Sequence, residues 1–141
     1  MILPDVNVLI GAFRQDAPNH EKCRAWLQSV VRSDTAYGMS PQALAAVVRI
    51  TTHARIFKPP EPLGTVLAYA QILLDQPHCQ VIQPGDRHWG IFRGLCQRAN
   101  ASGGLVQDAW FAAVAIEYGC EWITLDRDYA RFPGLRWRTP F

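Results

Sequence analysis

Two patterns of hydrophobic positions alternate along this chain: short unbroken apolar runs, and stretches in which apolar residues recur every three or four positions. Short apolar runs predict strands at residues 2–5, 36–39, 79–82, 121–125 and 135–138, the third of them buried and the last at an edge. Between these runs, apolar positions recur every three or four residues and predict helices over 6–13, 19–31, 41–53, 63–74, 86–99 and 105–118. Because no region contains strands alone, this alternation predicts an α/β fold with a mainly parallel sheet.

Residues that favour helix ends support these boundaries. Asn19 is available as an N-cap, and Ser40-Pro41 supplies an N-cap followed by a proline suited to the first helical position. The proline-rich run at residues 58–62 predicts a loop within the domain, since no repeat or low-complexity linker accompanies it. We therefore expect a single domain over residues 1–141.

Composition narrows the class of protein. Of 141 residues, 49% are hydrophobic and 18% are charged, which excludes a disordered chain or a coiled coil. The net charge of +2 is too small to identify a nucleic-acid binder. The longest apolar run, residues 109–116, is too short to cross a bilayer, and the start of the chain lacks the basic region of a secretory signal. We expect no membrane segment and a cytoplasmic location.

The cysteines and histidines suggest no chemistry of their own. No two cysteines form a CxxC pair, so we expect them to be reduced, mostly buried small hydrophobes: Cys23, Cys79, Cys96 and Cys120. No histidine has the partners of a nucleophilic site, and solvated or capping roles are expected for His20, His53, His78 and His88. Trp89 falls on the apolar side of its predicted helix, which favours packing in the core over stacking on a ligand.

Four aspartates stand where strands end or helices begin. Asp5 and Asp126 each follow an apolar strand run, with Asp128 close behind, and Asp108 is expected in the first turn of its helix. In a parallel α/β sheet these positions meet at one edge, beyond the carboxyl ends of the strands. Clustered carboxylates repel each other unless a cation neutralises them, and oxygen ligands suit Mg²⁺ or Mn²⁺. The pattern therefore predicts a metal-dependent site.

Each acid also has an ordinary structural explanation. Asp108 could serve only as a helix N-terminal acid, and Asp126 and Asp128 could serve only as turn formers. Asp5 is harder to explain in this way, since it follows a short apolar strand at the start of the chain. Taken together, the four positions favour the metal site.

Several sequence segments, taken together with their order along the chain, resemble those of a known family. These segments are Ile2–Ile10, Ser40–Ile50, Pro84–Trp89, Leu105–Ala109 with Ala112–Ile116, and Thr124–Leu135. Over essentially its whole length the chain resembles the PIN-domain ribonucleases, and specifically the VapC toxins of bacterial toxin–antitoxin pairs in the branch abundant in mycobacteria. The resemblance implies a three-layer α/β/α domain with a mainly parallel central sheet.

The same resemblance implies an activity and partners. It implies an endoribonuclease dependent on Mg²⁺ or Mn²⁺ that hydrolyses RNA, forms a homodimer and is held inactive by a VapB-type antitoxin. Asp5, Asp108 and Asp126 match the metal-binding acids of the family, and Asp128 a nearby auxiliary acid. Asn7 matches a polar residue that orients the site, although its amide could equally cap the first helix.

One position departs from the family pattern. Where PIN domains usually carry a glutamate in the helix after the second strand, this chain has Ala46. Gln42, one helical turn earlier, could contribute an amide oxygen but no charge. The missing acid motivates an alternative function, a weakened PIN domain that binds RNA or antitoxin without efficient cleavage.

Arginines outnumber lysines twelve to two and are the expected contacts for RNA phosphates. Arg127, between two candidate site acids, is the first choice, with an ion pair to those acids as the alternative. A phosphotransfer domain with Asp5 as nucleophile is disfavoured, because the Asp-x-Asp and lysine partners of that chemistry are absent.

Overall fold

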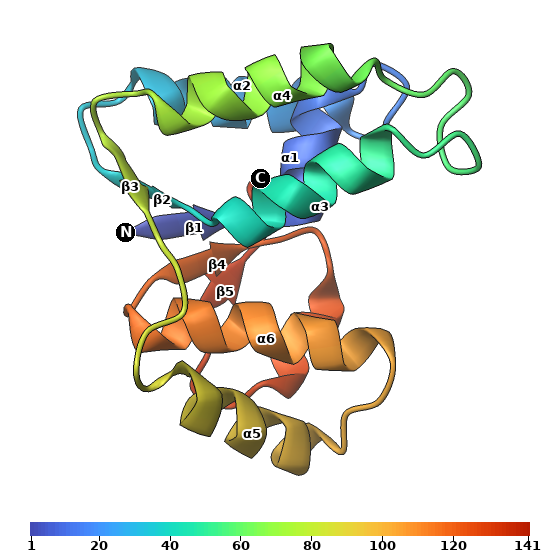
Figure 1. The fold of residues 1–141 in the computed structure, drawn as a ribbon. Coiled ribbons are helices and arrows are strands. Elements are labelled where there is room, and N and C mark those ends of the chain that lie inside the picture. Colours follow the sequence, from blue (N-terminus) through green and yellow to red (C-terminus); the bar gives the residue numbers. More distant parts are fainter.

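A five-stranded sheet forms the centre of the computed structural model, which describes all residues from 1 to 141 (Figure 1). The strands are β1 Ile2–Pro4, β2 Tyr37–Met39, β3 Cys79–Val81, β4 Glu121–Ile123 and β5 Trp137–Arg138. Their order across the sheet is β3-β2-β1-β4-β5, and every neighbouring pair is parallel. The predicted α/β class with a parallel sheet is confirmed.

Helices cover both faces of this sheet. They are α1 Val6–Phe13, α2 His20–Arg32, α3 Pro41–Thr51, α4 Leu63–Leu74, α5 His88–Ala99 and α6 Gly104–Glu117, with a short 3₁₀ helix, η1, at Arg127–Arg131. Helices α1 to α4 lie on one side of the strands and α5 and α6 on the other (Figure 1). The molecule is therefore the three-layer α/β/α arrangement that the family resemblance implied. None of the helices is long and apolar enough to cross a membrane.

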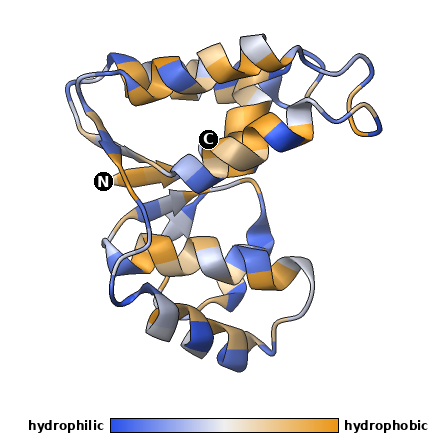
Figure 2. Ribbon diagram, in the orientation of Figure 1, coloured by the Kyte–Doolittle hydropathy of each residue, from blue (hydrophilic) through white to orange (hydrophobic).

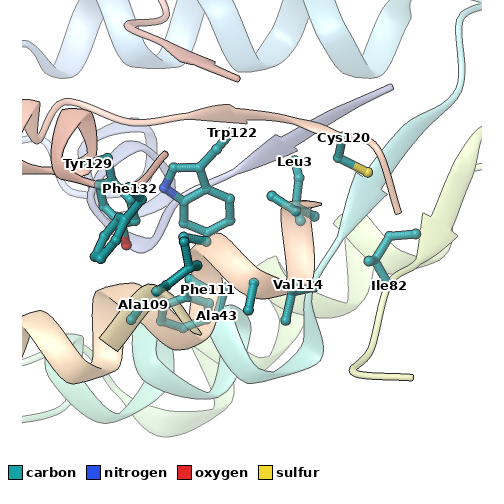
Figure 3. Close-up of a cluster of buried hydrophobic side chains, with 14 residues drawn as sticks. Leu3, Ala43, Ile82, Ala109, Phe111, Val114, Cys120, Trp122, Tyr129 and Phe132 are labelled. Atoms are coloured by element: carbon teal, nitrogen blue, oxygen red, sulfur yellow. The ribbon is translucent and has the colours of Figure 1, made fainter. Parts of the chain in front are cut away.

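The two helical layers bury separate hydrophobic cores. On one side, Leu9, Val47 and Val66 belong to a cluster built from α1, α3 and α4, among other elements. On the other side, Val114 and Trp122 belong to a cluster that joins α6 to β4 (Figure 3). The helices carry hydrophobic and hydrophilic residues in alternation along their length (Figure 2), as expected of elements with one side against a core.

The helix ends follow the sequence closely, with one difference. Ser40 caps α3, because its Oγ accepts the backbone N–H of Ala43 at 3.2 Å. Asn19 does stand at the N-cap position of α2, but its backbone is left-handed, with φ 61°, and its side chain makes no capping bond. The expected capping role of Asn19 is therefore wrong. An asparagine suits this position because it tolerates the left-handed conformation better than most residues.

Three burial predictions are also corrected. Strand β3 is at the edge of the sheet and leaves Val81 exposed, whereas a buried strand was expected. Trp89 is 64% exposed, so its predicted packing in the core is wrong. His88 is buried instead: its Nε2 lies 2.9 Å from the carbonyl oxygen of Trp110. Helix α5 packs closely against α6, and successive helical positions differ by about 100°, so only one of these two neighbours faces α6.

The strand order locates the crevice where a ligand is expected. From β1 the chain moves outward through β2 to β3, then returns to the other side of β1 and moves outward again through β4 to β5. Residues Ile2 to Pro4 of β1 pair with Glu121 to Ile123 of β4. In open parallel sheets the ligand crevice lies at such a reversal, beyond the carboxyl ends of the two central strands. The residues that follow β1 and β4 are Asp5 and Thr124.

Candidate active site

Asp5 is fixed at the carboxyl end of β1 by three hydrogen bonds. It is the N-cap of α1, and its Oδ1 accepts the backbone N–H of Val6 at 2.6 Å. Its Oδ2 accepts the hydroxyl of Thr124 at 2.6 Å and the side-chain amide of Asn7 at 3.0 Å. Only 5% of Asp5 is exposed. The carboxylate is thus held rigidly at the reversal in strand order.

Thr124 and Asn7 connect the ends of β1 and β4. Besides donating to Asp5, the Thr124 hydroxyl accepts the backbone N–H of Asp126 and the amide of Asn7, both at 3.0 Å. The Asn7 oxygen accepts the backbone N–H of Leu125 at 3.0 Å. The Asn7 side chain therefore bonds to the acid and to the end of β4 rather than capping α1. Thr124 was missed in the sequence, where it is one threonine at the end of an apolar run.

Asp108 lies on α6 but outside the first helical turn. It is the fifth residue of that helix, whereas a first-turn position was predicted. The structure extends the helix by one residue at its start, and no helix-terminal N–H donates to the carboxylate. Its hydrogen bond comes from the Tyr129 hydroxyl, 3.4 Å from Oδ1. A helix-capping role therefore does not account for Asp108.

Asp126 and Asp128, the two acids after β4, differ in their burial. Asp126 is half-buried and caps η1, with its Oδ1 accepting the backbone N–H of Asp128 at 2.9 Å. The turn-forming function considered for Asp126 is thus present, and its second oxygen takes no part in it. Asp128 and Arg127 are both exposed on η1. Arg127 forms no ion pair, so its proposed pairing with the neighbouring acids is absent.

An open groove of about 260 Å³ brings three of the four aspartates together. Its lining residues are Asp5, Val6, Asn7, Ile10, Ala46, Arg49, Ile50, Gln107, Asp108, Phe111, Asp126 and Tyr129. Helix α3 supplies Ala46 and Arg49, and the arginine was overlooked in the sequence. Gln42 is not part of this lining, because its Oε1 accepts the indole N–H of Trp110. The expected amide oxygen from Gln42 is therefore engaged elsewhere.

The groove raises the pKa values of Asp5 and Asp108. Burial, opposed in part by the hydrogen bonds from Thr124 and Val6 and assisted by the charges of Asp108 and Asp126, raises the pKa of Asp5 to about 7. Burial and the charge of Asp126 also raise the pKa of Asp108. No arginine, lysine or histidine forms an ion pair with any of the four aspartates. The groove therefore gathers carboxyl groups that no ion pair neutralises.

The donor set fits a hard divalent cation in chemistry but is not assembled in advance. All candidate ligands are carboxylate oxygens, which Mg²⁺ and Mn²⁺ prefer. However, no three histidine, cysteine, aspartate or glutamate side chains lie close enough together to hold a metal ion by themselves. Ala46, at the position where the family resemblance implies a glutamate, lines the same groove and supplies no ligand.

Comparison with known proteins identifies the class. The PIN domain family matches residues 2–135, and the chain belongs to that family. Its curated relatives include Ribonuclease VapC25 of Mycobacterium tuberculosis, 40% identical over 136 residues that make up 96% of each chain. Ribonuclease VapC33 of the same species is 36% identical over 99% of this chain and 98% of its own. The predicted resemblance to mycobacterial VapC proteins is confirmed.

Solved structures show the same fold at lower sequence identity. VapBC2 from Rickettsia felis, bound to a DNA fragment from its promoter, matches with a TM-score of 0.71 and 15% identity over 99% of this chain and 98% of the other. Mycobacterium tuberculosis VapC20, a toxin that cleaves the sarcin-ricin loop, matches with a TM-score of 0.66 and 15% identity over 96% and 99% of the two chains. These similarities confirm the fold.

Proposed function

We propose that this chain is the endoribonuclease toxin of a VapBC-type toxin–antitoxin pair and that it hydrolyses RNA with Mg²⁺ or Mn²⁺. The observation that carries the proposal is the rigid placement of Asp5 at the reversal in strand order, in one groove with Asp108 and Asp126. The aligned relatives named as ribonucleases support the reaction class. They also disfavour the alternative of a domain without efficient cleavage.

The aspartates and the polar residues that bond to Asp5 have separate functions in this proposal. Asp5, Asp108 and Asp126 would hold the cation, which when bound supplies charge for the phosphoryl oxygens and activates water. Thr124 and Asn7 hold the Asp5 carboxylate in place and tie it to the end of β4. Asp126, with Asp128 beside it, is positioned to orient the attacking water.

Two arginines are candidates for the RNA backbone. Arg49 lines the groove itself and forms no ion pair, so its guanidinium is available to a phosphate. Arg127 is exposed on η1, between Asp126 and Asp128 in the sequence. We propose Arg49 as the nearer contact and keep Arg127 as a contact at the rim.

The proposed partners follow from the same family. We propose a VapB-type antitoxin as the inhibitor, as in the VapBC complexes that share this fold, and a homodimer as the active form. RNA and such an antitoxin are both found in the cytoplasm, which is therefore the proposed place of action.

The test is cleavage of total RNA by purified protein freed of antitoxin. We expect cleavage with Mg²⁺ or Mn²⁺, none with EDTA, and a loss of at least about 100-fold in Asp5→Asn and Asp108→Asn. Asp34→Asn is the matched control, since this exposed acid lies outside the groove. Equal cleavage by the wild type and both groove variants would indicate a contaminating nuclease and contradict the proposed site.

A further inference from the structure

A second hollow of about 460 Å³ continues from the groove of the aspartates. The two share Asn7 and Ile10, which project from α1 into both. The second hollow extends past Leu125 to Ile56 and Phe57, in the loop that joins α3 to α4. The cleavage groove therefore does not end at the acids but runs on between α1 and this loop.

A buried arginine holds the loop against the end of α1. Arg14 is 7% exposed, and its Nε and Nη2 donate to the two carboxylate oxygens of Asp16 at 2.8 and 2.5 Å. Its Nη1 donates to Glu61 at 3.0 Å and to the carbonyl oxygen of Pro59 at 3.1 Å. Its guanidinium carbon also lies 4.4 Å from the ring centroid of Phe57. The loops after α1 and after α3 lie next to each other in Figure 1.

Burying the charge of Arg14 costs free energy, and the proposed reaction does not explain why this charge is buried. A buried charge is tolerated only when it is paired and hydrogen-bonded, and Arg14 uses two carboxylates and a carbonyl for that purpose. None of these groups touches the four aspartates of the site. The effect of the cluster is to fix Phe57 beside α1, while its neighbour Ile56 remains 53% exposed at the wall of the hollow.

The positive charge of the loop after α3 complements the negative charge of a nucleic-acid backbone. Residues 52–60 of the loop contain no acid and carry Arg55 and Lys58, both exposed and neither in an ion pair, and the exposed Arg49 precedes them in the last turn of α3. Glu61, which follows this stretch, is occupied by Arg14. The one charged residue that lines the hollow itself is Asp16, and its carboxylate is paired with Arg14. Single-stranded nucleic acid binds where cationic side chains follow the backbone and apolar or aromatic side chains contact the bases. The loop offers both beside one continuous groove.

We propose that the hollow between α1 and the loop binds the single-stranded RNA that runs on from the scissile phosphate. Arg55 and Lys58, which flank Ile56 and Phe57 on the loop, contact phosphates beside the hollow, and Ile56 and Phe57 form the wall against which a base packs. Arg14 is a positioning residue that holds the loop for this purpose. This inference rests on the proposed ribonuclease function and adds to it the site that selects the flanking nucleotides.

The first experiment measures RNA binding apart from cleavage. In the non-cleaving Asp108→Asn background, the affinity for a fluorescein-labelled, unstructured RNA oligonucleotide is measured by anisotropy at several salt concentrations. With both Arg55→Ala and Lys58→Ala, we expect affinity to fall about tenfold and the salt slope to decrease by about 1.4, since two single-strand phosphate contacts are removed. The matched control is Arg93→Ala with Arg98→Ala on α5, on the other side of the sheet.

Two outcomes would overturn this proposal. One is equal RNA affinity and salt slope for the loop variant and the α5 control. The other is unchanged RNA affinity with weakened antitoxin binding, which would assign the hollow to the antitoxin. If the loop variant loses RNA affinity while the otherwise unaltered protein cleaves no RNA, the binding site stands and the proposed nuclease function fails.

The second experiment tests Arg14. In the cleaving protein, we expect Arg14→Met to raise KM for a short RNA about tenfold with kcat changed less than about threefold, and to alter which phosphodiesters are cut. Arg14→Lys, which keeps the charge but not the forked geometry, should restore only part of the affinity. Circular dichroism confirms that each variant is folded. An unchanged KM and cleavage pattern in folded Arg14→Met would contradict the positioning function.

Discussion

The chemistry of the site depends on one carboxylate whose surroundings disfavour its charge. Asp5 is almost fully buried, and two further acids face the same groove, yet three donors hold its oxygens in place. Burial makes the ionised form costly, and the fixed donors ensure that the carboxylate cannot turn away toward solvent. A divalent cation would relieve that cost, so cation binding and ionisation of Asp5 are expected to be coupled.

This coupling predicts a pH dependence of stability. Without divalent cations, the pKa of Asp5 is about 7 in the folded chain and near its ordinary value of 3.8 when unfolded. The folded state therefore holds a proton that the unfolded state has lost, and stability falls as pH rises from about 4 to 7. Urea unfolding in EDTA at pH 5 and pH 8 should show the wild type losing stability relative to Asp5→Asn.

The control for this prediction is the addition of Mg²⁺ at pH 8, which should restore stability to the wild type and not to Asp5→Asn. A constant difference in unfolding free energy between the two proteins at both pH values would contradict the prediction.

At the scale of elements, α3 decides how strongly the groove can hold a cation. Its first turn is well built, with Ser40 capping it, and it presents Ala46 and then Arg49 to the groove one turn apart. The small apolar side chain of Ala46 thus occupies the wall of the groove, and the positively charged side chain of Arg49 follows it one turn later. In the proposed function, helix α3 would therefore contribute to binding RNA rather than the metal.

Ala46→Glu should convert this helix into a metal-binding element. An added carboxylate in the groove wall increases the ligand charge, which tightens binding of hard cations. We expect the Kd for Mn²⁺, measured by isothermal titration calorimetry, to fall about tenfold. Ala46→Gln is the matched control, because it has the same shape without the charge. Equal tightening by both variants would show that charge at this position is not the cause.

At the scale of the whole molecule, one sheet connects two cores. Leu9 belongs to the layer of α1 to α4, and Leu95 belongs to the layer of α5 and α6. Because β1 and β4 are paired at the centre, residues of both layers pack on the same strands. The site lies where these central strands end, so its geometry depends on both layers remaining in place.

The two layers are therefore expected to unfold together. Leu9→Ala and Leu95→Ala should each reduce the free energy of unfolding by about 2 to 5 kcal/mol, and circular dichroism and tryptophan fluorescence should give the same midpoint. Leu67→Ala, at an exposed position of α4, should change it by less than about 0.5 kcal/mol. Different midpoints for the two probes would mean that the layers unfold separately.

Much of the fold could be predicted from local patterns. Helix α4 begins and ends at the predicted residues, and the Ser40 cap of α3 is confirmed. These features depend on hydrophobic spacing and on the chemistry of a few neighbouring residues, which are present in the sequence itself. Trp89 and the strand β3 were misjudged, because whether an apolar side chain is covered depends on which elements stand beside it.

The sequence by itself determined the alternating elements and the positions of Asp5, Asp108 and Asp126 near their ends. Only the tertiary structure decided that Thr124 and Asn7 hold Asp5, that Arg49 lines the groove, and that Arg14 fixes a loop 45 residues further on. The physical reason is the separation along the chain between the residues that interact. Helix and strand formation depends on neighbours along the chain, whereas these contacts depend on the strand order that brings β1 beside β4 and places the loop after α3 against the end of α1.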